Sequence, residues 1–374
     1  MFVSPTGTQP HVDVETRGSQ HAGEVYITAR PACDGECLAQ AAALCETVAA
    51  VLDRHDAAVM HERHFATEDG LAALGDARTK ALAAFDDGVP PTRLLVPPSQ
   101  CGEISGITVH AVAGCGRPKV LPVGQRPGGR LLEMGAWSYL AGCDLQGDGA
   151  GEPGGQARQM LDAAESLLRS AGGSLHDVAR TWMWLGDILD WYGEFNRVRS
   201  ELFIARGLLL GDGGGRLPAS TGIGIGPAGP RCCAMDLVAT LGEAPRVLLS
   251  ATRQDAASKY GSAFSRAAVA RTPAGRTVYI SGTAAIDRAG NTTHLDDAAG
   301  QIHDTLMSVW TALRDAGSCP EDVVQAIVYC KTPQVRRIFR RQHANIRMPH
   351  MVTVADVCRE NLLFEVEATA MTKT

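Results

Sequence analysis

The chain has 374 residues, of which 45% are apolar and 20% charged, and its formal net charge is -6 at pH 7. This composition is typical of a soluble globular protein, and the negative charge argues against non-specific binding to nucleic acid or to an anionic membrane. No apolar run approaches the ~18 residues of a transmembrane helix, and the polar N-terminus lacks the pattern of a secretory signal. We expect a flexible tail over residues 1–20.

Eleven cysteines without a signal peptide indicate reduced thiols and a cytoplasmic protein. No metal site is expected, because the cysteines lack the two ligand pairs that zinc needs, and His61 and His64 are interpreted as surface residues on opposed faces. Glycine-rich stretches occur at 211–215 (GDGGG) and within PASTGIGIG (218–226). Neither follows a strand and opens a helix, so both are interpreted as loops, and no cofactor is expected.

Taken in chain order, one succession of elements occurs three times, and each copy is a strand, a helix, a strand, a second helix and a closing strand. The first copy contains EVYITAR, a helix from QAAAL to VLDRH, AAVMHERHF, GLAALGDARTKALAAF and ISGITVHAVAG. The second contains WSYLAGCDL, QARQMLDAAESLLRSAGG, VARTWMWL, YGEFNRVRSELFIAR and CCAMDLVATL. The third contains VYISGTAAI, QIHDTLMSVWTALRDAG, VVQAIVYC, VRRIFRRQHANIR and LLFEVEATAM.

The spacing between elements supports the repeat. Gln156 precedes Ala179 by 23 positions, and Gln301 precedes Val324 by the same 23. The helix that Gln301 opens shows apolar residues at helical spacing, and LLFEVEATA alternates apolar with polar residues as a half-buried strand does. We expect three domains after the tail, at residues 21–118, 119–245 and 246–374.

Each copy is expected to form a sheet with two helices on one face, and the sister copies cover the other face. The ISG before a turn, the Gln-led helix, the AG loop and the closing strand resemble the Rid (YjgF-like) superfamily. Its members are homotrimers of α+β (chorismate mutase-like) subunits around a central β-barrel, with small-molecule clefts between subunits. The resemblance implies three Rid-like repeats fused into a pseudo-trimeric β-barrel with the helices outside. The chain is then a monomer with internal pseudo-threefold symmetry, and a dimer is the alternative.

Four stretches within residues 130–374 together resemble the chorismatase branch of this superfamily, whose enzymes remove the enolpyruvyl group of chorismate. They are PASTGIGIG, ARTW, YISGTAAI and DVCRENLLFEVE. The resemblance implies an enzyme of secondary metabolism that binds a small anionic substrate and produces pyruvate and a hydroxybenzoate.

Glu365 matches the catalytic glutamate of that family. Cleavage of an enol ether begins when an acid protonates its terminal methylene, so the acid must stay protonated near neutral pH in an apolar setting. Glu365 lies between two apolar residues of the closing strand, and Ala234 and Thr108 are aligned with it in the other copies. One working cleft is therefore expected. Glu367 is interpreted as a structural carboxylate.

The expected substrate-binding residues are mainly cations, because chorismate carries two carboxylates that arginine can bind bidentately. Arg206 matches a family arginine, Tyr260 matches the tyrosine of a ligand-binding loop, and Arg266 and Arg359 lie near the matched motifs. Two small residues, Gly282 and Cys358, match members that make 3-hydroxybenzoate, whereas hydrolytic members carry alanine at both positions.

The chain also departs from the family pattern. Its loop YGSAFSRA (260–267) is two residues shorter and lacks an arginine, and Arg199 and Ser200 replace a tyrosine–arginine pair. Arg199 is the substitute for one missing cation. Met351 stands where single-domain Rid imine deaminases carry a carboxylate-binding arginine. Two alternatives therefore stay open, a Rid-type hydrolase or deaminase acting on another intermediate and a non-catalytic metabolite-binding protein.

Overall fold

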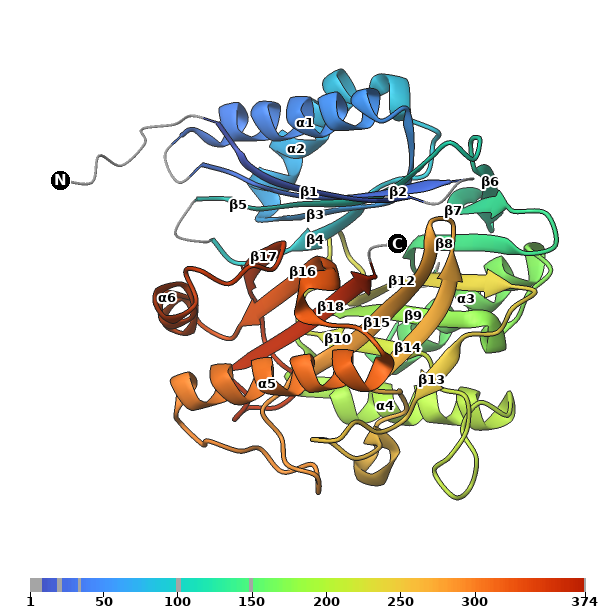
Figure 1. The fold of residues 1–374 in the computed structure, drawn as a ribbon, viewed down its shortest axis with the longest axis vertical. Helices are drawn as coiled ribbons and strands as arrows, with labels where there is room; N and C mark the ends of the chain where they lie inside the picture. Colours follow the sequence, from blue (N-terminus) through green and yellow to red (C-terminus); the bar gives the residue numbers. More distant parts are fainter. Residues whose placement is uncertain (1–8, 19–21, 33–34, 99–101, 148–150, 373–374) are drawn as a thin grey trace.

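A computed structural model describes residues 9–18, 22–32, 35–98, 102–147 and 151–372. It contains three six-stranded sheets and six α-helices in an α+β arrangement (Figure 1). Within these residues no helix combines the length and the apolar character needed to cross a membrane.

The first sheet has the strand order β1-β2-β5-β3-β4-β11. Its elements, apart from β11, are β1 (His11–Gly18), β2 (Gly23–Arg30), α1 (Cys37–Arg54), β3 (Ala57–Ala66), α2 (Glu68–Ala81), β4 (Thr92–Leu95) and β5 (Ile104–Ala113). The expectation of a flexible tail over 1–20 is wrong for β1, which pairs with β2 along its whole length. Residues 1–8, 19 and 20 lie outside the described residues.

The second sheet has the order β10-β9-β12-β8-β7-β6. This part of the chain contains β6 (Lys119–Val123), β7 (Arg126–Glu133), β8 (Ser138–Leu145), α3 (Pro153–Ser170), β9 (Val178–Leu185), α4 (Ile188–Ala205), β10 (Ala219–Ile223), β11 (Gly226–Pro227) and β12 (Cys233–Leu241). PASTGIGIG was expected to be a loop, but it forms β10 beside β9, and β11 pairs with β4 of the first sheet. The alternation of small residues with Ile allows this close pairing.

The third sheet has the order β13-β14-β15-β18-β16-β17. Its elements are β13 (Arg246–Leu248), β14 (Ala267–Thr272), β15 (Gly275–Ala284), α5 (Ala298–Ala316), β16 (Val323–Cys330), α6 (Pro333–Gln342), β17 (His350–Val354) and β18 (Phe364–Met371).

The three sheets share one topology. In each, the closing strand lies between the opening strand and the strand after the first helix, antiparallel to both. A parallel edge strand then follows the second helix, as β4, β10 and β17. This edge strand was not expected, because it is short and lies next to loop-like sequence.

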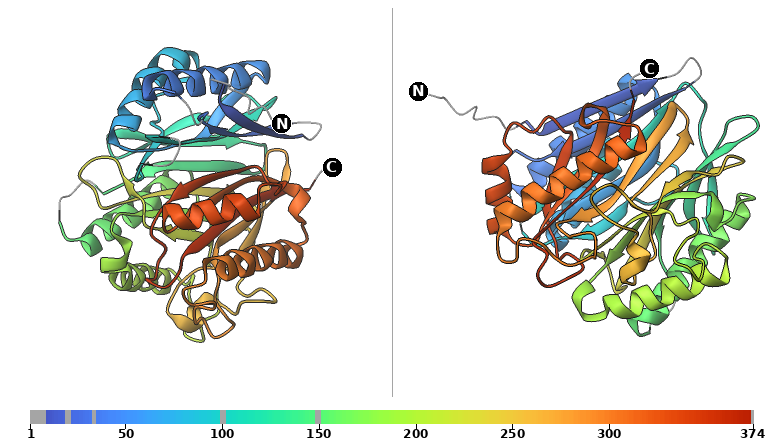
Figure 2. Two further views of the ribbon diagram at one scale, coloured as in Figure 1. Left: turned by 90° about the vertical axis from the view of Figure 1, so that its left-hand side faces the viewer. Right: turned by 60° about the horizontal axis from the view of Figure 1, so that its bottom comes forward.

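Each sheet packs helices against one face and turns its other face toward the centre of the molecule (Figures 1 and 2). One central hydrophobic cluster draws residues from all three parts, among them Phe65, Trp184 and Tyr329. At the seams between units, an edge strand of one sheet therefore lies beside an inner strand of the next, as β10 does beside β15 and β17 beside β5.

Candidate active site

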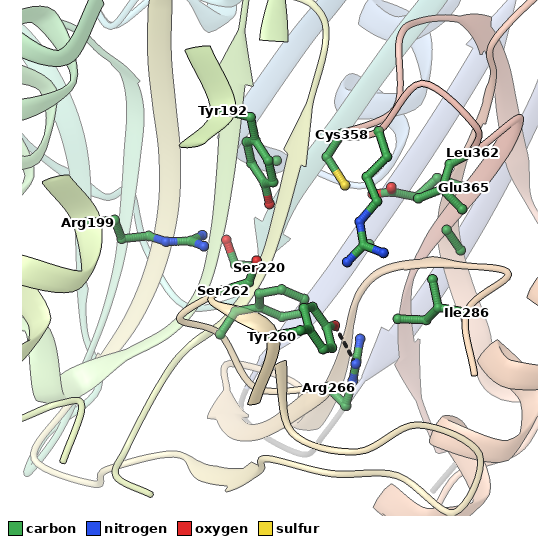
Figure 3. Close-up of a pocket in the computed structure, with 15 residues that line it drawn as sticks. Tyr192, Arg199, Ser220, Tyr260, Ser262, Arg266, Ile286, Cys358, Leu362 and Glu365 are labelled. Atoms are coloured by element: carbon green, nitrogen blue, oxygen red, sulfur yellow. Dashed lines mark hydrogen bonds between the residues drawn. The ribbon is translucent and has the colours of Figure 1, made fainter. Parts of the chain in front are cut away.

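A cavity lies at the seam between the second and third units (Figure 3). The second unit contributes side chains from α4 and β10, and the third contributes the segment 260–266, β15, the segment 358–362 and the start of β18. Its lining residues are Tyr192, Arg199, Ser220, Gly222, Tyr260, Ser262, Phe264, Arg266, Gly282, Ala284, Ile286, Cys358, Arg359, Leu362 and Glu365.

Seven of the eight predicted site residues line this cavity, and Arg206 does not. Arg206 follows the last turn of α4 on the surface, where its guanidinium is 48% exposed and binds Glu165 at 2.6 and 3.0 Å. The prediction that Arg206 binds substrate is therefore wrong for this cavity. Its place in the sequence resembled a binding arginine, but the helix ends with this side chain facing solvent.

Glu365 is buried at the start of β18, where it pairs with Ala284 on one side and Tyr329 on the other. Within the described part of the chain, its carboxyl group makes no hydrogen bond or ion pair. Burial, together with the nearby charge of Glu367, raises the pKa of Glu365 to about 8, although Arg180 opposes this shift. The carboxyl group is therefore protonated at neutral pH.

Glu367 has the opposite environment, although it lies two residues along the same strand and on the same face. Its carboxylate accepts hydrogen bonds from Arg180 Nη2 at 2.7 Å and from Trp182 Nε1 at 2.8 Å. These two donors hold the Glu367 carboxylate close to Glu365, and its charge is one of the causes of the raised pKa of Glu365. The structural role expected for Glu367 agrees with these contacts.

Three guanidinium groups line the cavity, and within the described residues none has a carboxylate partner within 4.0 Å. Arg199 is 1% exposed, donates from Nη2 to Asn196 Oδ1 at 2.6 Å and leaves its Nε without a partner. Burial lowers the pKa of Arg199. Arg266 donates to the carbonyl of Asp255, and Arg359 donates to a carbonyl at 2.5 Å. The cavity is therefore electropositive and has no internal counter-ion for these groups.

Tyr260 stands between two of the arginines. Its hydroxyl accepts a hydrogen bond from Arg266 Nη2 at 2.5 Å, and the Arg266 and Arg359 guanidiniums lie 5.5 and 5.3 Å from its ring centroid. These cation–π contacts fix the ring against the backbone of Gly290, where an added Cβ would collide with it. Tyr260 thus holds the two arginines on one side of the cavity.

Gly282 and Cys358 line the cavity close to Glu365. A Cβ at position 282 would overlap Glu365 Oε1 and come within 3.0 Å of Thr221 Cγ2, so only glycine fits this arrangement. The thiol of Cys358 is neutral, because burial and then the charge of Glu365 raise its pKa to about 12. Both small residues therefore shape the space beside the acid.

The strand registers correct one alignment. Glu365 is opposite Tyr329, Ala234 is opposite Trp184, and Gly106 is opposite Phe65. The first-unit counterpart of Glu365 is therefore Gly106 and not Thr108, which the sequence spacing had suggested. The spacing misled because β3 and β5 contain register shifts. Only the third unit carries a carboxylate at this position in either alignment.

Sequence reasoning missed several lining residues, including Tyr192, Ser262, Phe264 and Leu362. Tyr192 and Arg199 are seven residues apart on α4 and so share a helix face, which was a usable signal. His61 and His64 were interpreted as surface residues, but both are buried, and His64 binds Glu62 at 2.7 Å. No cluster of three metal-binding side chains occurs among the described residues.

The free volume of the cavity is about 50 Å³. A cavity of roughly 150 Å³ is needed to hold a benzene ring, so side chains must move before a ring-sized ligand can enter. The half-buried side chains on its wall are Tyr192, Tyr260, Phe264, Cys358 and Arg359. Movement of Tyr260 or Arg359 would break the hydrogen bonds that these two side chains make to Arg266 and to the carbonyl of Gly290.

Comparison with known proteins places this geometry in a family. Residues 255–372 match the family model described as Endoribonuclease L-PSP. A chorismatase crystal structure matches over 98% of this chain and 100% of its own, with 18% identity and a TM-score of 0.61. A YjgF/YER057c/UK114 family member from Mycobacterium tuberculosis matches over 34% of this chain and 100% of its own, with 22% identity and a TM-score of 0.27.

These findings define first a class of α+β proteins with three Rid-like units. The third unit matches the Endoribonuclease L-PSP family model, and the whole chain shares the fold of the chorismatase structure. The resemblance drawn from the sequence is confirmed.

Proposed function

We propose that the chain is a chorismatase-like enzyme that cleaves the enolpyruvyl ether of chorismate or a related cyclic carboxylic acid. One observation carries this proposal, namely a buried carboxyl group with a pKa of about 8 in a cavity lined by three guanidiniums without carboxylate partners. A protonated acid supplies a proton to carbon, and free guanidiniums supply the charge that a dicarboxylate needs.

The reaction starts with proton transfer from Glu365 to the terminal methylene of the enol ether. The ether carbon becomes an oxocarbenium ion, and the Glu365 carboxylate that remains stabilises this positive charge. When water attacks the cationic carbon, it forms a hemiketal. The bond between that carbon and the ether oxygen then breaks as the hemiketal hydroxyl passes its proton to the ether oxygen, so pyruvate leaves and a hydroxyl remains on the ring. Glu365 recovers its proton from the attacking hydroxyl or water.

The nature of the nucleophile decides the product. Capture by water releases a dihydrodiol. Capture by the substrate's own ring hydroxyl gives a cyclic ketal instead; cleavage of the C–O bond of that hydroxyl to the ring, with loss of the proton on the neighbouring ether-bearing ring carbon, makes the ring aromatic, and cleavage of the remaining hemiketal bond then releases pyruvate and 3-hydroxybenzoate. The atoms of chorismic acid equal those of pyruvic and 3-hydroxybenzoic acid together, so the second route needs no cofactor and no net water. Gly282 and Cys358 match the 3-hydroxybenzoate type, and Gly282 supports this route because its missing Cβ leaves room for the Glu365 carboxyl itself beside Thr221.

Arg199, Arg266 and Arg359 are assigned to the carboxylates of the substrate. Arg199 is fully enclosed and approaches from α4 of the second unit, whereas Arg266 comes from the third unit beside Tyr260 (Figure 3). Arg359 also belongs to the third unit, and the Tyr260 ring contacts both Arg266 and Arg359. Two carboxylates bound from opposite walls would fix the enol ether across the cavity, with its methylene near Glu365.

A second candidate function is binding of a metabolite without turnover. The small free volume of about 50 Å³ favours it, because the resting cavity does not accept a ring. The hydrolase or deaminase alternative has less support, since Met351 is fully buried in the central cluster and provides no cation.

The finer architecture is also a proposal. The shared central cluster supports a pseudo-trimeric barrel-like core, divided into domains at 21–118, 119–245 and 246–374, in a monomer with pseudo-threefold symmetry. We further propose a cytoplasmic location and a role in secondary metabolism, which the reduced cysteines and the hydroxybenzoate product support.

Incubation of the purified protein with chorismate tests the main proposal. Mass spectrometry should detect pyruvate with 3-hydroxybenzoate, and calorimetry should measure chorismate binding in parallel. Binding without any product would support the non-catalytic alternative, and absence of both would end the chorismate assignment.

A further inference from the structure

A second and larger cavity adjoins the candidate active site. Its free volume is about 420 Å³, compared with about 50 Å³ in the cavity of Glu365. It lies between the end of α4, the turn that follows α4 and the segment 258–263. Its lining residues are Ser200, Ile204, Leu209, Leu210, Gly211, Asp212, Gly213, Ser258, Lys259, Gly261, Ser262 and Ala263.

A single thickness of chain separates the two cavities. In the segment 260–264, Tyr260 and Phe264 line the first cavity, Gly261 and Ala263 line the second, and Ser262 lines both. Ser262 is therefore the residue at which the two cavities come closest.

Neighbouring residues of α4 also line different cavities. Arg199 is part of the first cavity, and the next residue, Ser200, is part of the second. Both walls of the second cavity thus come from the segments that also build the first, so the two cavities are direct neighbours.

The lining of the second cavity suits an uncharged, apolar group. Ile204 and Leu210 are 60% and 51% exposed, although large aliphatic side chains gain by being covered. The charged residues are already engaged, since Asp212 accepts a hydrogen bond from Gly214 N at 2.9 Å and Lys259 pairs with Asp255 at 2.9 Å. Nothing in this lining therefore calls for a charged ligand.

We propose that the second cavity binds an uncharged alkyl or aryl substituent of the substrate, while the carboxylates remain with the arginines of the first cavity. This inference rests on the proposed function, and it defines the preferred substrate as a cyclic carboxylic acid that is larger than chorismate. A volume of about 420 Å³ lies within the ~300–1,000 Å³ range of small-molecule sites, whereas the first cavity alone is far below it.

Gly211 offers a direct way to fill the second cavity. It lines this cavity and not the first, its φ lies outside the left-handed region, and a Cβ added there meets no atom within 4 Å. Gly211→Phe therefore places a ring in the cavity without backbone strain. Gly193→Phe is the matched control, because Gly193 is exposed on α4 and is equally open to a Cβ.

The test measures binding of 3-hydroxybenzoate, 3-hexyloxybenzoate and 4-hexyloxybenzoate by calorimetry. Each buried methylene strengthens binding about fourfold, so at least one hexyloxy compound should bind the wild type at least about tenfold more tightly than 3-hydroxybenzoate. Gly211→Phe should abolish this gain and leave 3-hydroxybenzoate binding within about twofold, whereas Gly193→Phe should retain the gain.

Three results would overturn the inference. They are no gain from either hexyloxy group, a gain that persists in Gly211→Phe, and an equal loss in Gly193→Phe. Chorismate turnover by the same proteins separates this inference from the proposed function. If a hexyloxy group strengthens binding but chorismate is not turned over, the second cavity is supported and the chorismate assignment is removed. If chorismate is turned over but no hexyloxy group strengthens binding, the proposed function is supported and the inference about the second cavity is removed.

Discussion

Replacement of Glu365 by glutamine tests the proton donor with the smallest change in shape. Glutamine keeps the size of the side chain and its neutrality at pH 7, but it cannot transfer a proton to carbon. General acid catalysis contributes about 10²–10⁴-fold to a rate, so kcat of Glu365→Gln should fall by this factor. Binding of the substrate should change little, because the arginines hold the carboxylates.

The same variant has a predictable effect on stability. The pKa of Glu365 rises from an ordinary 4.5 to about 8 in the folded chain. Between these values the unfolded chain carries the charge and the folded chain carries the proton, so wild-type stability falls as the pH rises from 4.5 toward 8. One pKa unit corresponds to about 1.4 kcal/mol, and this proton uptake therefore costs ~3 kcal/mol at pH 7. Glu365→Gln removes this cost.

Stopped-flow kinetics and denaturant unfolding across pH 5–9 measure both effects. Wild-type kcat should fall tenfold per pH unit above about 8. The kcat of Glu365→Gln should be lower and should depend less on pH. The free energy of unfolding of Glu365→Gln, relative to that of the wild type, should be higher at pH 7 than at pH 4.5. Glu46→Gln on the exposed face of α1 is the control and should match the wild type. Wild-type turnover by Glu365→Gln would refute the acid role. An unchanged stability difference across pH would refute the raised pKa.

The remaining predictions concern the arginines and the glycine beside the acid. Arg199→Gln should raise KM by about 10–150-fold through loss of charge-assisted hydrogen bonds and should also raise Tm, because it removes a buried cation that lacks a carboxylate partner. Arg206→Gln should leave KM within about twofold, since that side chain faces solvent, and a comparable KM increase in both variants would contradict the assignment. Gly282→Ala should lower kcat at least about tenfold, because its Cβ displaces the Glu365 carboxyl, and should shift the product from 3-hydroxybenzoate toward the dihydrodiol. Chromatography of the products decides this, and an unchanged rate and product ratio would remove Gly282 from the specificity role.

The repeat and most of the site could be predicted from the sequence, because both depend on local patterns. Period-two strands and the Gln-led helices identified the three units, and the motifs around Gly282, Cys358 and Glu365 lie on the short segments that meet at one seam. The edge strand β10 could not be predicted, since its pairing with β9 depends on a distant partner rather than on its own glycine-rich sequence.

Arg206 and Arg199 show where sequence reasoning failed and why. They lie seven residues apart on or just after α4, so both belong to the same helical region. That spacing alone would put both on one helix face, but α4 ends at Ala205 and Arg206 is its C-cap residue, whose φ of -99° and ψ of 2° are no longer helical. The structure turns Arg199 inward and leaves Arg206 with Glu165 on the outside. Arg199 thus replaces one of the cations that the family pattern has and this chain lacks, and the direction of its side chain could be known only from the tertiary structure.

The three units differ at the position of Glu365, and this difference is the reason that we expect one catalytic cleft in the chain. At the position of Glu365 the second unit has Ala234 and the first has Gly106, where an added Cβ would collide with the carbonyl of Ala29. The second unit does carry a buried acid two residues further along, Asp236, but Arg63 binds it at 2.5 Å. That ion pair stabilises the charged form, and the pKa of Asp236 is accordingly lowered. An acid that is ionised and fully bonded cannot give a proton to carbon, so Asp236 cannot take in the second unit the role proposed for Glu365 in the third.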